Sequence, residues 1–467
     1  MNKISKYIKQ FVALLSIGAV VYIAVCCLIP PLFQNGGTEI PETETPQATD
    51  AAERVCIVDD NEDALLWRLR MIQEAKKEIV LVTFELRDDT SGRAIMAALL
   101  NAADRGVSVR ILVDGVDGKL RLHDSRNFEA FLAHENIEVK FYNPLRLSAL
   151  WKVNYRLHDK YFIIDHTAYI LGGRNTHDIY LGNFAENAQC DRDIVVYEAA
   201  IADGNSLEQL RMYFETMWAL EDCVLLSSKM DSQKQEEVCG KLAEHLEEVL
   251  MQYEDQLMPI AWHSETIAVD SITLLTGSPE AWNKASVLWE RLCQLMKIAE
   301  HEIILETPVL ICDDAMLDRL AEICSEAAPI QIITNAPEIN PNLLSATYPY
   351  QKSRVLEIGT EINEYCGDKP LHTKTILIDD HISVIGSYNL DARSTYIDTE
   401  IMLVIESKEV NTLLKNQAEE MQNQSKQITS DGAVTYGSNC APAALSSGRK
   451  VLNTILSVVL YPFQYLL

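Results

Sequence analysis

Paired cysteines are almost absent from this chain of 467 residues. None of its eleven cysteines forms a Cys-x-x-Cys pair, so the ligand spacing of a structural zinc site is missing and we expect neither a metal nor another cofactor. Beyond residue 33 the cysteines are odd in number and stand singly, which argues against a complete disulfide framework.

Positive charge is also scarce. The chain has 40 Lys and Arg against 68 Asp and Glu, a net charge of −28. Nucleic-acid binding needs basic side chains that displace counterions, and no stripe of Lys and Arg occurs, so we expect no nucleic-acid partner. An anionic membrane would also repel this surface unless a segment held the protein there.

Residues 1–33 predict such a tether, an N-terminal transmembrane anchor. The run from Phe11 to Phe33 is free of charge and as a helix would be long enough to cross a bilayer. Lys3, Lys6 and Lys9 precede it, so the positive-inside rule predicts a cytoplasmic N-terminus, with the bulk of the protein outside the cell membrane. A cleavable signal peptide is the alternative interpretation.

Apolar strands alternate with amphipathic helices through most of the remaining chain. A strand at 78–86 (EIVLVTFEL), a helix at 92–105 and a strand at 107–113 give a βαβ pattern. The pattern returns at 302–310 (EIILETPVL) and 330–333, which indicates an internal duplication. We therefore expect an α/β fold of two homologous domains related by a pseudo-two-fold axis, each with a mixed sheet flanked by helices.

Composition suggests where these domains begin and end. We expect a linker at 34–52, a first domain at 53–260, a second domain at 261–421, and a tail at 422–467. The tail combines a Gln/Ser/Asn-rich linker with an apolar C-terminal segment that either associates with the membrane or packs on the protein.

Chemistry-bearing residues recur at identical spacings in the two halves, in the pattern His-x-Lys-x4-Asp-x6-Gly-x-x-Asn. A packing duplication preserves apolar periodicity but has no reason to retain His, Lys and Asn at the same offsets twice. Laid out as a strand, residues 158–164 would project the histidine and the lysine on one face. The two sets are His158, Lys160, Asp165, Gly172, Gly173 and Asn175, and His372, Lys374, Asp379, Gly386, Ser387 and Asn389.

These sets resemble the paired HKD motifs of the phospholipase D superfamily, over roughly residues 53–420. The segments 386–405 (GSYNLDARSTYIDTEIMLVI) and 88–115 are most similar to bacterial cardiolipin synthases. Ala392 and Asp398 depart from the block GSxNLDPRSxxxNTE of those synthases, at positions outside the catalytic set.

The resemblance implies that one histidine attacks a phosphodiester, giving a phosphohistidine, while the other protonates the leaving alcohol. It implies His158 as the nucleophile and His372 as the acid and base. The lysines and asparagines would surround the phosphate oxygens, with Ser387 and Gly173 beside the substrate. Asp165 and Asp379 belong to the motifs, and we expect them to act mainly within the structure or its polar network.

Each histidine also needs an acceptor at its second ring nitrogen. Glu400 lies just before the strand IMLVI that follows His372. By analogy Asp193, just before IVVY, is expected to serve the first motif, with Asp191 as the substitute.

The sequence is compatible with four functions. The first is a phosphatidyltransferase that makes cardiolipin from phosphatidylglycerol and a second phospholipid or alcohol. The second is a phospholipase D that transfers to water and releases phosphatidic acid. A membrane-tethered nuclease and a non-catalytic scaffold are the others, disfavoured by the acidity and by the intact motifs.

Overall fold

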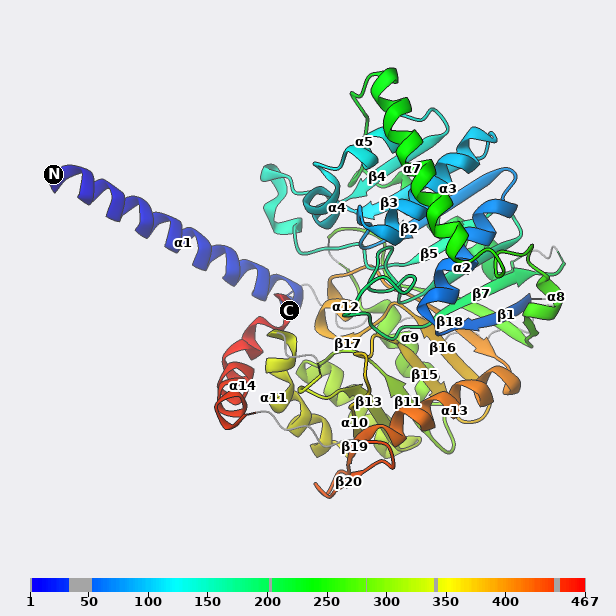
Figure 1. Ribbon diagram of the computed structural model, residues 1–467. Coiled ribbons are helices and arrows are strands. Elements are labelled where there is room, and N and C mark those ends of the chain that lie inside the picture. The colour runs from blue at the N-terminus through cyan, green and yellow to red at the C-terminus, as the bar shows by residue number, and fades with distance from the viewer. Residues whose placement is uncertain are drawn as a thin grey trace.

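The computed structural model describes residues 2–32, 53–200, 204–282, 284–339, 343–440 and 446–466. The linker expected at 34–52 lies outside these residues. Helix α1 (Asn2–Leu32) extends away from the rest of the molecule (Figure 1). In the part of the chain that the structure describes, no helix combines the length and apolarity needed to cross a bilayer. The anchor expected at 1–33 stays a prediction.

The first half builds a nine-stranded sheet in the order β8-β4-β3-β2-β5-β6-β7-β1-β9. Strands β2, β3 and β4 are parallel, whereas β5, β6, β7 and β1 pair antiparallel. Its elements are β1 (Glu53–Val58), α2 (Asn61–Glu74), β2 (Glu78–Thr83), α3 (Thr90–Asp104), β3 (Ser108–Asp114), α4 (Gly115–Leu122), α5 (Arg126–Phe131), β4 (Ile137–Tyr142), η1 (Leu147–Lys152), β5 (Tyr161–Ile164), β6 (Ala168–Gly172), β7 (Asp193–Glu198), α6 (Ser206–Ala219), β8 (Cys223–Leu225), α7 (Ser232–Gln252), α8 (Trp262–Glu265) and β9 (Ile267–Ala268).

The second half repeats this plan in a nine-stranded sheet of order β10-β18-β16-β15-β11-β13-β14-β19-β20. Read backwards, β19 to β10 match β8 to β1 strand for strand, so the expected duplication is a property of the fold. The elements are β10 (Ser271–Thr276), α9 (Val287–Met296), β11 (Ile303–Glu306), β12 (Leu310–Ile311), α10 (Asp314–Glu326), β13 (Ile330–Asn335), α11 (Leu343–Glu357), β14 (Glu361–Tyr365), β15 (Thr375–Ile378), β16 (Ile382–Gly386), β17 (Leu390–Asp391), α12 (Ala392–Tyr396), β18 (Ile401–Glu406), α13 (Lys408–Asn423), β19 (Ser425–Ile428), β20 (Val434–Tyr436), α14 (Ser447–Leu460) and η2 (Tyr461–Leu466).

One continuous core joins the two halves. Alternate residues of β2 point to opposite faces of the first sheet, as a strand requires. Ile79 and Leu81 pack under α2, α3, α5 and α7, the helices that cover one face in Figure 1. Val80 and Val82 belong to a core that continues into the second half. The two sheets therefore bury faces on each other, and the mixed α/β fold with two large sheets is confirmed.

Two expected boundaries differ from the structure. Strand β9 still pairs with β1, and β10 opens the second sheet, so the sheets divide between Ala268 and Ser271 rather than at 260. Residues 422–439 are not simply a linker, because β19 pairs with β14 and β20 pairs with β19 at the edge of the second sheet. Their backbone hydrogen bonds outweigh the loop-like composition of this stretch.

Candidate active site

Both motifs end in tight hairpins. Asp165 follows β5 and Asp379 follows β15, each with positive φ (50° and 47°). The Asp165 carboxylate accepts the backbone N–H groups of residues 76–78, and Asp379 accepts those of residues 300–302. Both aspartates thus tie each hairpin to the start of the neighbouring strand. They contribute to the fold and do not contact the histidines.

The catalytic candidates precede these strands. Residues 158–160 lie outside the strand, and β5 begins only at Tyr161, so the strand expected at 158–164 is shorter. The strand starts later because the backbone N–H of His158 donates to the Thr399 hydroxyl at 3.0 Å and not to a neighbouring strand.

Two residues at the ends of parallel strands hold the segments just before the histidines. Asp114, the last residue of β3, accepts from the guanidinium of Arg156 and from the backbone N–H of Leu157 (3.1 Å). Asn335, the last residue of β13, bonds both the N–H and the C=O of Leu371 at 2.7 Å. Neither residue was predicted from the sequence. The sequence feature that could have identified them is a polar residue at the end of a buried apolar strand.

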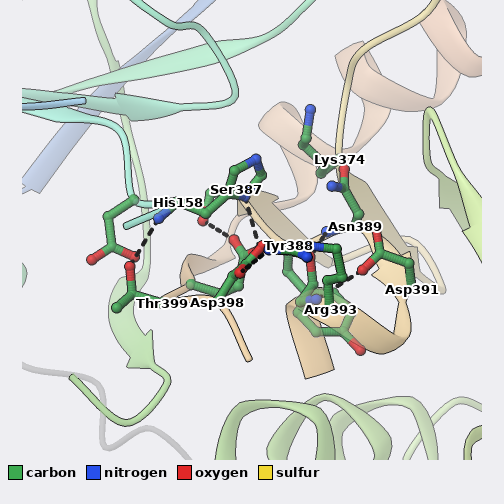
Figure 2. A network of polar contacts seen from close by, with 12 residues as sticks. His158, Lys374, Ser387, Tyr388, Asn389, Asp391, Arg393, Asp398 and Thr399 are labelled. Atoms are coloured by element: carbon green, nitrogen blue, oxygen red, sulfur yellow. Dashed lines mark hydrogen bonds and ion pairs between the residues drawn. The ribbon is translucent and has the colours of Figure 1, made fainter. Parts of the chain in front are cut away.

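Each histidine is held by a carboxylate of the opposite half. His158 Nδ1 lies 2.8 Å from Glu400 Oε1, and His372 Nδ1 lies 2.5 Å from Asp191 Oδ2. The backbone also connects the two halves here, because the N–H of His372 donates to the C=O of Cys190 at 2.7 Å. Figure 2 shows Thr399, Asp398 and Ser387 of the second half around His158. Holding Nδ1 leaves Nε2 of each ring available for chemistry.

The expectation for Asp193 is wrong. Its carboxylate instead pairs with the buried guanidinium groups of Arg68 (2.9 Å) and Arg174 (3.5 Å). Glu400 does contact a histidine, but that histidine is His158 rather than the one in its own half.

Strand register explains the error. The N–H of Gly173 bonds the C=O of Arg192, and the N–H of Ser387 bonds the C=O of Ile401. The residue before each carbonyl is Asp191 in one half and Glu400 in the other, so these two are equivalent. Aligning the apolar runs placed the first carboxylate two residues too late, on the same face but beyond reach of the ring.

Ser387 and Gly173 occupy equivalent places beside these carboxylates. The Ser387 hydroxyl donates to Glu400, and Ser394 adds a second hydroxyl at 2.6 Å. A Cβ atom on Gly173 would lie 2.3 Å from Asp191 Oδ1. The Asp191 carboxylate occupies this space, so a serine side chain would not fit at position 173. Both residues therefore support a carboxylate in this structure.

The two motif lysines lie with their histidines. Lys160 Nζ donates to the carbonyl of His158 at 2.5 Å, and Lys374 Nζ lies 2.7 Å from His372 Nδ1. Aromatic rings pack on both imidazoles: Phe84 has its centroid 5.6 Å from His158, and Tyr180 lies 4.8 Å from His372.

The motif asparagines differ in their contacts. Asn175 Oδ1 accepts the backbone N–H of Glu85 at 3.3 Å. Asn389 Oδ1 is buried and has no hydrogen-bond partner among the described residues. Asn389 therefore keeps a side-chain acceptor that the protein leaves unpaired.

Burial dominates the electrostatics of the site. It lowers the pKa of His158 well below its usual range and that of His372 to about 4. The charge of Lys374 contributes to the fall at His158, and that of Lys160 to the fall at His372, so the two motifs share one electrostatic site. Burial therefore favours the neutral form of both imidazoles.

The pKa values of the two carboxylates that contact the histidines are shifted in opposite directions. Burial raises the pKa of Glu400 to about 8, despite the nearby charge of Lys160. Burial also acts on Asp191, but Lys374 and His372 outweigh it and lower the pKa to about 2. Asp191 is therefore ionised near pH 7, whereas a large fraction of Glu400 is protonated.

A third lysine, unnoticed in the sequence, adds to the charge near Glu400. Lys284 is 7% exposed, and its Nζ has no hydrogen-bond partner in the described part of the chain. Asp159 is also buried, and one of its oxygens accepts a hydrogen bond from the Tyr213 hydroxyl at 2.9 Å. Burial raises the pKa of Asp159 to about 7 and lowers that of Lys284 to about 8.

Within the described ranges, no group of three or more His, Cys, Asp and Glu residues is placed to hold a metal ion.

Comparison with known proteins places this geometry in a family. The family model described as "Cardiolipin synthase, PLD-like domain" matches residues 69–218 and 292–422, one segment in each half. The chain belongs to this family. Both matched segments contain one histidine motif with its lysine and asparagine, as the resemblance in the sequence had implied.

Individual relatives agree with this assignment. Cardiolipin synthase C of Escherichia coli (strain K12) is 26% identical over 412 residues, covering 75% of this chain and 81% of that protein. An uncharacterized protein of Helicobacter pylori is 26% identical over 410 residues, covering 78% and 79%. The crystal structure of phosphatidylserine synthase from Haemophilus influenzae Rd KW20 has a TM-score of 0.62 and 14% identity, covering 89% and 97%, which supports the fold alone.

Proposed function

We propose that this protein is a membrane-anchored phosphatidyltransferase that makes cardiolipin from phosphatidylglycerol and a second phospholipid through a phosphohistidine intermediate. The observation that carries the proposal is the crossed pair of histidine–carboxylate contacts, His158–Glu400 and His372–Asp191. The cardiolipin synthases among its relatives support the substrate class.

Two transfers make up the reaction. Nε2 of one neutral histidine attacks phosphorus, and the bond from phosphorus to the leaving glycerol oxygen breaks as the other histidine donates a proton to that oxygen. A hydroxyl of the acceptor lipid then gives its proton to the second histidine and attacks phosphorus, which breaks the N–P bond. The same residues with water as the acceptor would make a phospholipase D, the second candidate.

His158 is assigned as the nucleophile and His372 as the acid and base. An ionised carboxylate stabilises an imidazolium, and Asp191 stays ionised beside His372 because its pKa is about 2. Glu400, with a pKa raised to about 8, stabilises a protonated His158 less well. His158 therefore suits the role of the neutral partner.

The motif lysines and asparagines are assigned to the phosphate. Lys160 and Lys374 supply positive charge to its non-bridging oxygens, and the side-chain amides of Asn175 and Asn389 supply N–H donors. The buried setting strengthens each of these interactions relative to water.

Membrane anchoring belongs to the same proposal. The apolar side chains of α1 from Phe11 to Val21 are mostly more than half exposed, which would be costly in water over so long a helix. The N-terminus is proposed to be cytoplasmic because Lys3, Lys6 and Lys9 precede the apolar run.

Lipid product analysis tests this function. Purified protein with labelled phosphatidylglycerol should give a diphosphatidyl product. Phosphatidic acid as the sole product would replace the transferase by the hydrolase. His158→Asn and His372→Asn should each lower turnover by about 10³-fold or more, whereas His381→Asn, at a half-exposed histidine, should not.

A substrate with a good leaving group separates the two histidine roles. A p-nitrophenyl phosphodiester needs no proton donor in the first step. His372→Asn should therefore still form an acid-labile phosphoenzyme from it, and His158→Asn should not. The reverse pattern would exchange the roles, and full activity in both variants would end the catalytic proposal.

A further inference from the structure

Helix α14 has an inverted distribution of polarity. Its two buried residues are polar, Asn453 and Ser457, at 3% and 2% exposure. Five apolar side chains on the same helix are between 49% and 60% exposed. Their spacing places them on one face of a helix. This outer apolar face consists of Val451, Leu452, Ile455, Val458 and Val459.

Polar contacts fix the orientation of this helix. α14 packs on α11, and the Tyr461 hydroxyl just after it bonds Asp314 and the guanidinium of Arg354 at 2.8 and 2.7 Å. Four residues later the buried hydroxyl of Tyr465 donates to Asp313 at 2.8 Å. Rotating α14 to bury its apolar residues would break these bonds, so the apolar face stays outward.

Other exposed apolar residues lie on the same side of the molecule. α1 contacts both η1 and η2, and Figure 1 shows the base of α1 beside η2 and the C-terminal end, with α14 close by. In and before η1, Leu145 and Trp151 are 47% and 46% exposed. The outer apolar face of α14 and the exposed apolar helix α1 therefore both adjoin η2.

We propose that the outer apolar face of α14 lies in the interfacial region of a phospholipid bilayer. A 14-residue helix is about 21 Å long, too short to cross a hydrocarbon core of about 30 Å but suited to lying along its surface. The exposed Arg449 and Lys450 at its start suit contact with lipid phosphates. A second copy of the chain is the weaker occupant, because each copy carries a net charge of −28.

This docking would bring the bilayer next to the candidate active site. η2 packs on α12, where Arg393 Nη1 donates to the carbonyl of Tyr465 at 3.4 Å. The neighbouring Ser394 donates to Glu400, the partner of His158. The inference goes beyond the reaction itself, because lipid contact at α14 can be measured without turnover.

Photolabelling of the full wild-type chain tests the proposal. The protein is reconstituted into vesicles of phosphatidylglycerol and phosphatidylethanolamine that contain a phospholipid with a diazirine in its acyl chain. After illumination, peptides covering 447–460 should carry lipid adducts on the outer apolar face. Met212 and Leu413, exposed at 58% and 40% on other elements, should carry none. Absence of adducts from α14, with adducts on α1, would overturn the proposal.

Paired substitutions give a second test. Ile455→Glu with Val458→Glu should lower turnover of phosphatidylglycerol in vesicles by roughly tenfold or more, because two charges would enter the interface. Turnover of a short-chain, water-soluble phosphatidylglycerol should not change, and Leu413→Glu should change neither. Equal losses on both substrates would contradict the role of docking. If wild type converts neither substrate, the proposed function fails, while the photolabelling still decides the docking.

Discussion

At the residue scale, neighbouring carboxylates in this chain have opposite tasks. Asp193 begins β7 and Asp191 lies two residues before it, yet Asp191 holds an imidazole while Asp193 neutralises two buried arginines. The chemical group is the same in both residues, so the position of each along the chain decides which partner its carboxylate meets.

Substitution by asparagine should therefore have different effects at the two positions. Asp191→Asn should lower kcat by roughly 100-fold or more with little loss of stability, because His372 loses the charge that supports its protonated form. Asp193→Asn should lower the free energy of unfolding by about 3–5 kcal/mol, because Arg68 and Arg174 stay buried without their counter-charge. Kinetics of the folded fraction and denaturant unfolding measure both, and exchanged results would restore the original assignment of Asp193.

The motif lysines predict an alkaline limit to activity. Burial lowers the pKa of Lys160 to about 7 and that of Lys374 to about 8. A lysine is charged below its pKa, so kcat/KM should fall as the pH rises through 7 to 8.

Lys160→Arg tests this origin of the limit. A guanidinium keeps its charge, so the fall in kcat/KM should move to higher pH, while the maximum decreases because the geometry changes. Lys415→Arg, on α13 in a contact with Glu302, is the matched control. An unchanged pH profile in Lys160→Arg would assign the limit to another group.

At the element scale, the aspartates of the motifs secure hairpins. Asp379 caps three backbone N–H groups at the start of β11. Burial tends to raise the pKa of Asp379, but these three backbone bonds outweigh it and the pKa is lowered.

Asp379→Ala should reduce the free energy of unfolding by about 1–2 kcal/mol at pH 7 and change kcat of the folded enzyme by less than about twofold. A lowered pKa means that the stabilising contribution is present above the unfolded-state pKa and lost as the pH falls through the folded-state pKa. The difference between wild type and variant should therefore narrow below about pH 4. A large loss of kcat with unchanged stability would make Asp379 catalytic after all.

At the scale of the whole molecule, Arg192 connects the two halves. Its buried guanidinium bonds Asp59 at 2.8 Å in the first half, and Glu306, Thr375 and Gln417 at 2.7 to 2.8 Å in the second. It stands one residue after Asp191, so the same backbone segment joins the halves and orients His372.

Arg192→Leu should lower the free energy of unfolding by about 3–5 kcal/mol, because it leaves the buried carboxylate of Glu306 unpaired. Arg319→Leu removes partly exposed pairs with Glu290 on α9 and Glu322 on α10, and should cost about 1 kcal/mol or less. Urea unfolding followed by circular dichroism gives both values. Equal costs would show that the contact between the halves does not depend on this arginine.

The sequence determined the repeated chemistry. His158, Lys160 and Asn175 and their counterparts are local patterns. So are the strands expected at 78–86 and 302–310, which the structure shows as the shorter strands β2 (Glu78–Thr83) and β11 (Ile303–Glu306), because apolar periodicity and short spacings depend only on neighbouring residues. The sequence also predicted that the chain belongs to a phospholipase D-like family and has a mixed α/β fold.

Only the tertiary structure decided which residue completes each site. His158 and Glu400 are 242 positions apart, and His372 and Asp191 are 181 positions apart. No spacing rule links such positions, and a two-residue difference in strand register was enough to favour Asp193. The packing of the two sheets likewise decided that α14 turns its apolar side chains outward, because Tyr461 and Tyr465 find their polar partners on the protein.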